Sequence, residues 1–350
     1  MSAMTFGFGM ITAQHHPDDP RSDAELYAEV LHLCELAERL GFDAVWLSEH
    51  HFVDDGYMPS LLPVAAAIAA RTTRIRIGTG ILIAPLHDPL RLAEDAATVD
   101  LLSSGRLVLG IGAGYREEEF AGFGRSKERL GAALDQTLAV LRQAWSGEPV
   151  QATPDAAPVR VTPRPYRPAG PPLWIGARTA PGIRRVARKA DGLMAARVTP
   201  EQFGAQVRQL LAEAEKAGRQ PAEFEVGVHR PVFAWPEKDA WERLEPYLHY
   251  SEWKYRDMVG EPYGRRTTRV TPPPLREETR DILRKEAIVG TPDEVAEAIA
   301  AYARNASDVR FHFVPRLYWP GMDAALQREA LAVFAEHVIP QFRANRHTNS

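Results

Sequence analysis

Three ionisable side chains follow directly on an apolar run in the segment Trp46 to Phe52, where Glu49, His50 and His51 stand side by side. A histidine at the end of a buried strand can accept or donate a proton near neutral pH. Adjacent side chains of an extended segment point in opposite directions, so we expect at most one of the two histidines to face a given site. Histidines packed at the start of a loop are the structural alternative.

Metal binding is the other chemistry that a histidine pair could support. A zinc-binding helix carries its two histidines four residues apart, with a glutamate after the first, and this run lacks that spacing. We therefore predict no metal site and expect one of the two histidines to act in proton transfer.

Glycines interrupt two further apolar runs. Gly78 and Gly80 lie within residues 75–83, and Gly110, Gly112 and Gly114 lie within residues 109–115. Glycine inside a strand often marks a bulge or a close approach to the backbone, as by a flat aromatic ring. The second run is similar to a dinucleotide-binding loop, but its third glycine comes one residue early and no suitably placed acid ends a following strand.

The run from Trp174 to Gly182 joins an apolar strand to a helix. The start of a helix presents free N–H groups and the positive end of its dipole to a phosphate. Arg178 and Thr179 add a charge and a hydroxyl at this point. We predict a phosphate-binding site here, with an ordinary capped helix start as the alternative.

These residues have to be positioned by the elements around them, and strands alternate with helices along the chain. The apolar patterns predict eight strand-then-helix units. The strands are 6–11, 44–47, 75–83, 107–111, 173–175, 192–196, 224–229 and 309–314, and the helices are 23–40, 63–70, 90–102, 128–145, 180–189, 200–217, 291–304 and 323–342. Eight such units favour an α/β fold of the closed (β/α)8 TIM-barrel type over a doubly wound sheet. Active sites of such barrels lie at the carboxyl ends of the strands, where the candidate residues fall.

We expect one domain, residues 1–350, with an irregular insertion late in the barrel at residues 236–285. The insertion is rich in aromatic residues, among them Trp241, Tyr247, Tyr250, Trp253 and Tyr255. It is interpreted either as a structured cover on the barrel or as a lid over a substrate pocket.

The composition of the chain limits the kinds of partner that it can bind. The formal net charge of −4 argues against a nucleic-acid or acidic-lipid partner, because both need a basic face. The single cysteine, Cys34, lies in an apolar helical run and is expected to be a small buried thiol. We find neither a leader peptide nor an apolar stretch long enough to span a membrane, so a cytoplasmic protein is expected.

Several motifs together resemble the bacterial-luciferase-like flavin-dependent monooxygenases. They keep their order and spacing from residue 5 to about residue 343, and residues 236–285 are not covered. The matching pieces are Ser48 to Phe52; Gly78 to Gly80 with Pro85 and Asp88-Pro89; Leu101 to Leu107; Gly110 to Tyr115 with Glu119-Phe120 and Phe123-Gly124; Gly176 to Thr179; Val289 to Pro292; and Val338 to Pro340.

The resemblance implies a barrel that takes reduced FMN as a cosubstrate from a separate flavin reductase. In this family the reduced flavin reacts with O2 to give a C4a-peroxide, which oxygenates a small organic substrate. The aromatic insertion suggests an apolar or aromatic substrate. The family also forms dimers through the helices after the second and third strands, so a homodimer is expected.

The resemblance assigns roles residue by residue. His50 corresponds to the catalytic histidine. The Thr79-Gly80 bond corresponds to a non-proline cis peptide beneath the flavin ring. Further cofactor-binding positions are Gly112, Gly114 and Tyr115 at one strand end, and Gly176, Ala177, Arg178 and Thr179 at the phosphate site.

Two alternatives stay open. Bacterial luciferase has a reactive cysteine and an arginine where this chain has Gly112 and Ala113, so light emission from an aldehyde is not expected. Relatives of the same barrel bind a deazaflavin and transfer hydride, although the Glu-His-His-Phe run favours FMN. A flavin-binding protein without turnover is a further possibility, against which His50 argues, since a shared fold does not establish the chemistry.

Overall fold

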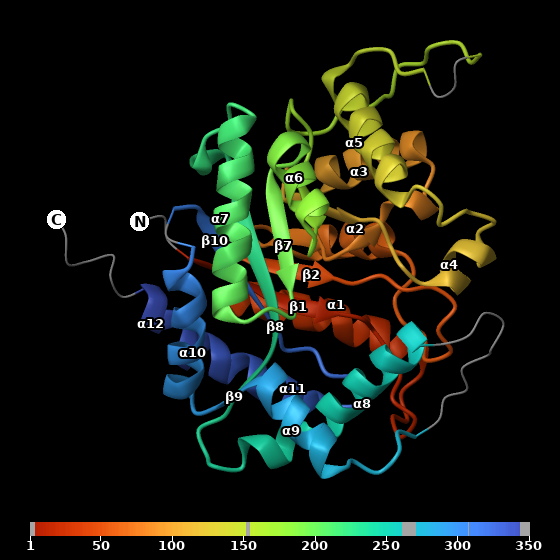
Figure 1. Ribbon diagram of the computed structural model, residues 1–350. Coiled ribbons are helices and arrows are strands. Elements are labelled where there is room, and N and C mark those ends of the chain that lie inside the picture. The colour runs from red at the N-terminus through yellow and green to blue at the C-terminus, as the bar shows by residue number, and fades with distance from the viewer. Residues whose placement is uncertain (1–3, 152–154, 261–270, 307, 344–350) are drawn as a thin grey trace.

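Short runs of apolar residues form the parallel strands of a closed barrel. The computed structural model describes residues 4–151, 155–260, 271–306 and 308–343 (Figure 1). In these ranges the barrel strands are β1 (Thr5–Ile11), β2 (Ala44–Leu47), β3 (Arg76–Thr79), β5 (Leu107–Gly112), β6 (Leu173–Gly176), β7 (Gly192–Ala196), β8 (Glu225–Ala234) and β10 (Arg310–Arg316). They pair in this order, and β10 pairs with both β8 and β1, which closes the ring. The predicted (β/α)8 barrel is confirmed.

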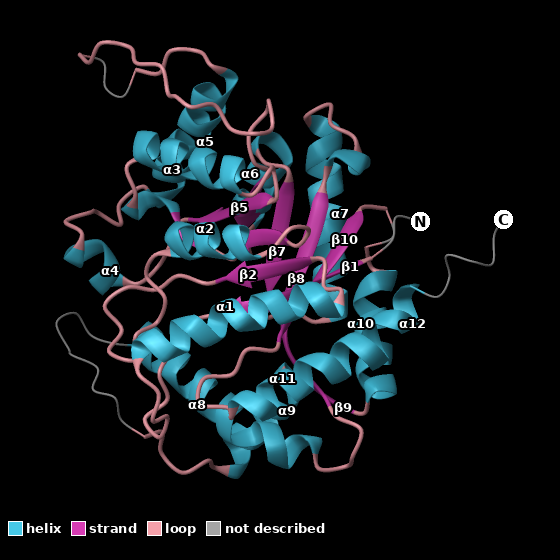
Figure 2. Cartoon of the chain, turned by 180° about the vertical axis from the view of Figure 1, so that it is seen from behind, coloured by secondary structure: helices cyan, strands magenta, loops and turns pink. Residues whose placement is uncertain are grey.

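Helices surround the strands on the outside, as Figure 2 shows from the back. They are α1 (Asp23–Leu40), α2 (Leu61–Arg71), α3 (Pro89–Leu102), α5 (Leu130–Ser146), α6 (Ala180–Lys189), α7 (Pro200–Lys216), α10 (Pro292–Arg304), α11 (Ala324–Val333) and α12 (Ile339–Arg343). A helix start predicted from sequence is found at Thr291, whose side chain accepts a hydrogen bond from the backbone N–H of Glu294. Cys34 lies on the buried face of α1, as expected.

The predicted strand 75–83 is interrupted. It consists of β3, a break, and β4 (Leu82–Ile83), which pairs with the far end of β5. The cis peptide bond in the break joins Gly80 to Ile81, so the assignment to Thr79-Gly80 was one residue too early. The break brings the carbonyl oxygen of Thr79 against Gly110, where a Cβ would lie only 2.0 Å from that oxygen. Only glycine fits at position 110 for this reason.

The segment 236–285 is not irregular, which corrects the prediction. It holds two helices, α8 (Ala240–Gly260) and α9 (Glu277–Glu286), while residues 261–270 lie outside the described residues. Leu244 and Leu248 of α8 pack with Trp319 and Met322 in a second apolar cluster. After α9 the short strand β9 (Ile288–Gly290) extends the barrel by pairing with the end of β8.

Two tryptophans fill the interior of the barrel. The rings of Trp46 and Trp174 lie 5.0 Å apart, and Trp46 Nε1 donates a hydrogen bond of 2.8 Å to His312 Nε2. Burial lowers the pKa of His312 to about 3, so this ring is neutral. Glycines provide the space, since a Cβ on Gly7 would lie 2.5 Å from Trp46 Nε1 and one on Gly192 would lie 2.5 Å from Trp174 Nε1. This packed layer closes the barrel beneath the carboxyl ends of the strands.

Candidate active site

His50 is held by a buried carboxylate from a different part of the chain. Its Nδ1 lies 2.8 Å from Oε1 of Glu119, a residue of the short helix α4 (Glu117–Gly122). The same oxygen accepts the backbone N–H of His51 at 3.0 Å, and Glu119 is fully buried. Because a carboxylate oxygen accepts, we assign the ring proton to Nδ1, which leaves Nε2 of His50 as an acceptor.

Three tyrosine rings surround His50. The rings of Tyr57, Tyr115 and Tyr255 have their centroids 4.8, 5.8 and 6.3 Å from the imidazole. The Tyr115 hydroxyl lies 3.3 Å from His50 Nε2. Burial raises the pKa of Tyr57 to about 12 and also raises the pKa of Tyr115, so both phenols stay protonated at neutral pH. Tyr115 can therefore donate to Nε2, the atom through which His50 would act.

His51 faces away from these tyrosines. Its Nε2 lies 2.6 Å from Oε1 of Glu49, which also lies 3.2 Å from His87 Nε2. The other Glu49 oxygen accepts the backbone N–H of Ile83 at 2.7 Å. Burial alone would raise the pKa of Glu49, but the hydrogen bonds from His51 and His87 hold it below its usual value. This network ties the end of β2 to β4 and so supports the site without entering it.

Replacement of Glu49 by glutamine should destabilise the fold by about 2 kcal/mol at pH 7, because a buried, paired carboxylate is lost. A carboxylate whose pKa is lowered in the folded state stabilises that state above its unfolded pKa of about 4.3, and the contribution is lost as the pH falls through the lower folded value. Urea unfolding of both proteins should show a difference that keeps its size from pH 7 to about pH 5 and shrinks between about pH 4 and about pH 2. Glu35→Gln is the control, since Glu35 forms a partly exposed pair with Arg71 at 3.9 Å. A loss at about pH 2 as large as the loss at pH 7 would contradict a role for the charge.

Glycines at three strand ends lie around one side chain, Ile81. A Cβ on Gly112 would lie 2.8 Å from the Ile81 side chain, and one on Gly176 would lie 2.9 Å from it. Gly114 has a φ of +73°, a conformation that favours glycine, and the next residue, Tyr115, is 41% exposed. The structure thus brings together Gly80, Gly112, Gly114, Tyr115 and Gly176 at the carboxyl ends of β3, β5 and β6. The hydroxyl of Thr79 is buried and donates to the carbonyl oxygen of Gly110 at 2.7 Å.

The residues predicted to bind phosphate lie at the start of α6. Ala177 is buried, whereas Arg178 and Thr179 are exposed. Thr179 caps the helix by accepting the backbone N–H of Gly182 at 3.4 Å. Capping leaves other N–H groups of the first turn without a partner inside the helix, and Arg178 stays available beside them.

The sequence of this chain matches the family described as luciferase-like monooxygenase over residues 6–308. The chain belongs to this family. Its fold resembles that of the monooxygenase RslO1 from Streptomyces bottropensis, with 27% identity, a TM-score of 0.82, and coverage of 97% of this chain and 100% of the other. It is 27% identical to 4-hydroxyprotoasukamycin monooxygenase from Streptomyces nodosus subsp. asukaensis, over 97% of this chain and 92% of the relative. The family match and these two full-length similarities thus agree that the chain is a member of the luciferase-like monooxygenase family.

The chain spans about half the length of several other curated relatives that it matches. One is the oxygenase component of the flavin-dependent trigonelline monooxygenase of Acinetobacter baylyi, 30% identical over 49% of either chain. Another is the F420-dependent glucose-6-phosphate dehydrogenase of Amycolatopsis mediterranei, 32% identical over 45% of this chain and 50% of the relative. Both flavin and deazaflavin enzymes are therefore similar to this luciferase-like chain.

Ion pairs hold helix α8 of the luciferase-like chain against the loops after β2 and β7. Glu252 accepts two hydrogen bonds from the Arg197 guanidinium, at 2.8 and 2.9 Å, and that guanidinium lies 4.5 Å from the Tyr255 ring. Lys254 Nζ binds Asp54 at 2.7 Å. Glu252 and Lys254 are almost fully buried, so these contacts exclude water where α8 meets the loops after β2 and β7.

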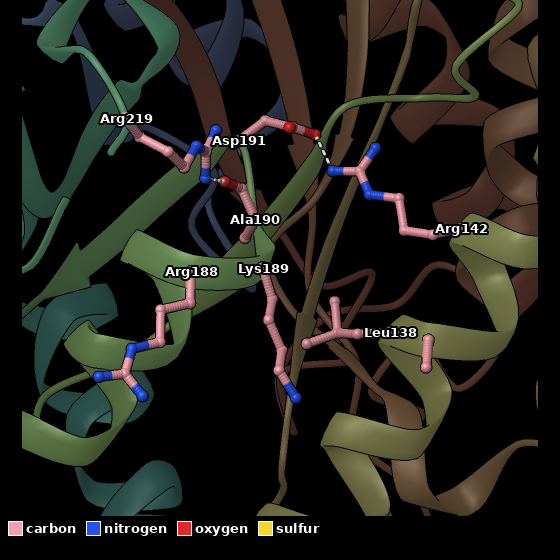
Figure 3. Close-up of a pocket in the computed structure, with 8 residues that line it drawn as sticks. Leu138, Arg142, Arg188, Lys189, Ala190, Asp191 and Arg219 are labelled. Carbon is pink, nitrogen blue, oxygen red and sulfur yellow. Dashed lines mark hydrogen bonds and ion pairs between the residues drawn. The ribbon is translucent and has the colours of Figure 1, made fainter. Parts of the chain in front are cut away.

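A hollow of about 420 Å³ lies at the opposite, amino-terminal end of the strands, between α5 and α6 (Figure 3). Several of its charged residues are already engaged. Arg142 binds Asp191 at 2.6 Å, Arg219 donates to the carbonyl oxygen of Ala190 at 2.7 Å, and Lys189 binds Asp135 at 2.9 Å. These contacts connect neighbouring elements, and we assign the hollow a structural role in the luciferase-like barrel.

Sequence reasoning missed several residues of this site. Glu119 belongs to a matched motif of the luciferase-like family, but its role becomes visible only when α4 places it against His50, 69 residues away. Tyr57 and Arg197 carry no local signal. Glu252 and Lys254 do carry a local signal in the sequence, because two charged residues within an aromatic segment suggest buried ion pairs. No helix in the described part of the chain is long and apolar enough to cross a membrane.

Proposed function

We propose that this chain is the oxygenase of a flavin-dependent monooxygenase that uses reduced FMN and O2 to oxygenate a small organic substrate. The observation that supports this most is the acceptor nitrogen of His50, which Glu119 orients towards Tyr115 beside the glycine-lined strand ends. A separate reductase would supply the reduced FMN, in keeping with the relative that is named an oxygenase component.

The residues present fit a flavin. Gly112 and Gly176 make room for the side chain of Ile81, which lies against both and gives the strand ends an apolar surface that suits a flavin ring. The exposed start of α6, with Arg178 and Thr179, suits the phosphate of FMN. When bound there, reduced FMN would supply the electrons that activate oxygen.

The protein's own residues have distinct roles in this proposal. His50 accepts or returns a proton at Nε2, Tyr115 donates a hydrogen bond to that atom, and Glu119 positions the ring. Helix α8 acts as a lid that covers the site of a single domain, residues 1–350, and its Tyr255 completes the aromatic wall around His50. Exclusion of water by the lid protects reactive species in the site.

Titration of the protein with reduced FMN in the absence of oxygen, followed by admission of oxygen, tests the proposal. We expect FMN to bind and to reoxidise with a time course that differs from that of free FMN, and we expect His50→Asn to change that time course. Absence of FMN binding would contradict the proposal.

Deazaflavin-dependent hydride transfer is the second candidate, favoured by the similarity to an F420-dependent dehydrogenase. Tight binding of F420 without binding of FMN, and substrate oxidation or reduction without oxygen uptake, would establish it in place of the oxygenase. FMN binding with unchanged reoxidation would instead favour a flavin-binding protein without turnover.

Replacement of Arg178 by alanine should weaken FMN binding by about tenfold, the loss of one hydrogen bond to a charged group. Riboflavin, which lacks the phosphate, should bind equally well to both proteins. Fluorescence titration with each flavin measures this. Arg184→Ala is the matched control, because Arg184 lies on α6, the helix that follows Arg178, but pairs with Glu213 at 3.5 Å. Equal weakening of FMN and riboflavin would show that Arg178 does not bind the phosphate.

We also propose a homodimer through α2 and α3. An apolar hollow of about 390 Å³ lies beside α2, lined by Tyr27, Leu31, Pro59, Ser60, Pro63, Val64 and Ala67. Sedimentation should give twice the chain mass of 38.9 kDa.

A further inference from the structure

Arg316 occupies an unusual position at the carboxyl end of β10. Alternate residues of this strand face the barrel interior, since His312 contacts Trp46 and Val314 belongs to the same interior cluster. Arg316 continues this face, and only 8% of its surface is exposed. Its guanidinium carbon lies 5.3 Å from the Trp319 ring, and its Nε donates a long hydrogen bond of 3.4 Å to the carbonyl oxygen of Tyr318.

No carboxylate pairs with Arg316 among the residues that the structure describes. The acid that influences it, Glu252, forms its two short hydrogen bonds with Arg197 instead. Burial lowers the pKa of Arg316, as expected for a cation removed from water. A buried charge without a partner is costly, and proteins retain one where a ligand supplies the opposite charge.

The titratable groups near Arg316 do not supply that charge. Burial raises the pKa of Tyr57 to about 12, so its phenol is neutral. Burial lowers the pKa of His229 to about 3, so its ring is also neutral, and Arg197 adds a second cation nearby. Tyr57 in turn packs against His50 at 4.8 Å. The unpaired guanidinium therefore belongs to the same end of the barrel as the proposed catalytic histidine.

We propose that Arg316 binds an anionic oxygen group of the substrate, a carboxylate or a phenolate, and so fixes its orientation towards His50. A guanidinium offers two parallel N–H groups that match a carboxylate, and the tyrosine rings around His50 suit an aromatic body. The assignment to the substrate rests on the proposed function. The phosphate of FMN is a less suitable partner, because its predicted site follows β6, from which β10 is separated by β7 and β8 in the barrel.

Calorimetric titration of the full chain with benzoate and with its neutral analogue benzamide tests this, with and without FMN. We expect benzoate to bind at least about tenfold more tightly than benzamide, in line with a charged hydrogen bond, and Arg316→Met to abolish that preference. Affinity for FMN should change less than twofold. Arg188→Met is the matched control, because Arg188 lines the hollow at the opposite end of the barrel and its loss should leave benzoate binding unchanged.

A thermal unfolding measurement distinguishes a role of Arg316 in ligand binding from a purely structural role. Arg316→Met should raise Tm by about 2–4 °C, because an unpaired buried charge is removed. A lower Tm together with unchanged benzoate binding would overturn the proposal, as would equal binding of benzoate and benzamide by the unaltered protein. If Arg316→Met lowered the affinity for FMN tenfold while benzoate binding persisted, the anion bound by Arg316 would be the phosphate of FMN. Failure of FMN to bind at all would contradict the proposed function. The benzoate titration without FMN would still test the role of Arg316.

Discussion

Replacement of His50 by asparagine should lower turnover by about 10²- to 10⁴-fold, the usual contribution of a positioned acid–base residue. Asparagine retains a polar side chain beside Glu119 but cannot shuttle a proton at the position of Nε2. FMN affinity should stay within twofold, because the glycine-lined strand ends and the start of α6 are untouched. Oxygen uptake with saturating reduced FMN and stopped-flow reoxidation measure the two quantities separately.

His87→Asn is the control for this substitution. His87 also lies close to a buried carboxylate, at 3.2 Å from Glu49, but it does not contact the tyrosines around His50 in the described structure. Its replacement should leave turnover within about threefold. Similar losses in the two variants would mean that His50 contributes through stability alone.

Replacement of Glu119 by leucine should lower turnover by about 10- to 100-fold, the effect expected when the residue that orients a functional histidine is lost. Without the carboxylate at 2.8 Å, nothing holds the ring proton on Nδ1, and Nε2 no longer stays an acceptor. Long-range ¹H–¹⁵N spectra of the histidine side chains should show the proton on Nδ1 of His50 in the unaltered protein and on Nε2 in the variant.

Glu119→Gln separates the charge from the hydrogen bond. The amide oxygen can still accept from Nδ1–H, so the NMR spectrum should stay close to that of the unaltered protein while the pH profile of turnover changes. This variant also keeps the test valid if the leucine variant does not fold. Glu118→Gln is the control, since Glu118 pairs with Arg116 and not with His50. An unchanged tautomer in Glu119→Leu would refute the positioning role.

The barrel could be predicted because its strands and helices are locally coded. The run Ala44–Leu47 has the same bounds in the structure as in the sequence pattern. The break after Thr79 could not be predicted, because it depends on how closely the backbone approaches Gly110 on a different strand. Helix α8 was missed because Pro246 and a high content of aromatic residues hide its helical period.

The residues of the candidate site also divide into those that the local sequence indicates and those that depend on contacts between distant segments. The histidine pair was recognisable as a candidate because it stands directly after an apolar strand, where a barrel places its chemistry, and the family resemblance singled out His50. The contacts around His50 were not recognisable, since Tyr115, expected only as a cofactor-binding residue, reaches His50 from 65 residues away and Arg197 meets Glu252 across 55 residues. Contacts of that kind depend on packing, which leaves no periodic signature in the sequence.

The tryptophans that lie on glycines inside the barrel have an evolutionary consequence. A side chain added at Gly7 or Gly78 collides with the indole of Trp46, while a smaller residue at position 46 would leave a void beside both glycines. Either change alone should destabilise the fold, so we expect these positions to be inherited as a unit. Among descendants of a common ancestor, a lineage that has lost the indole should be the one in which side chains are found at positions 7 and 78.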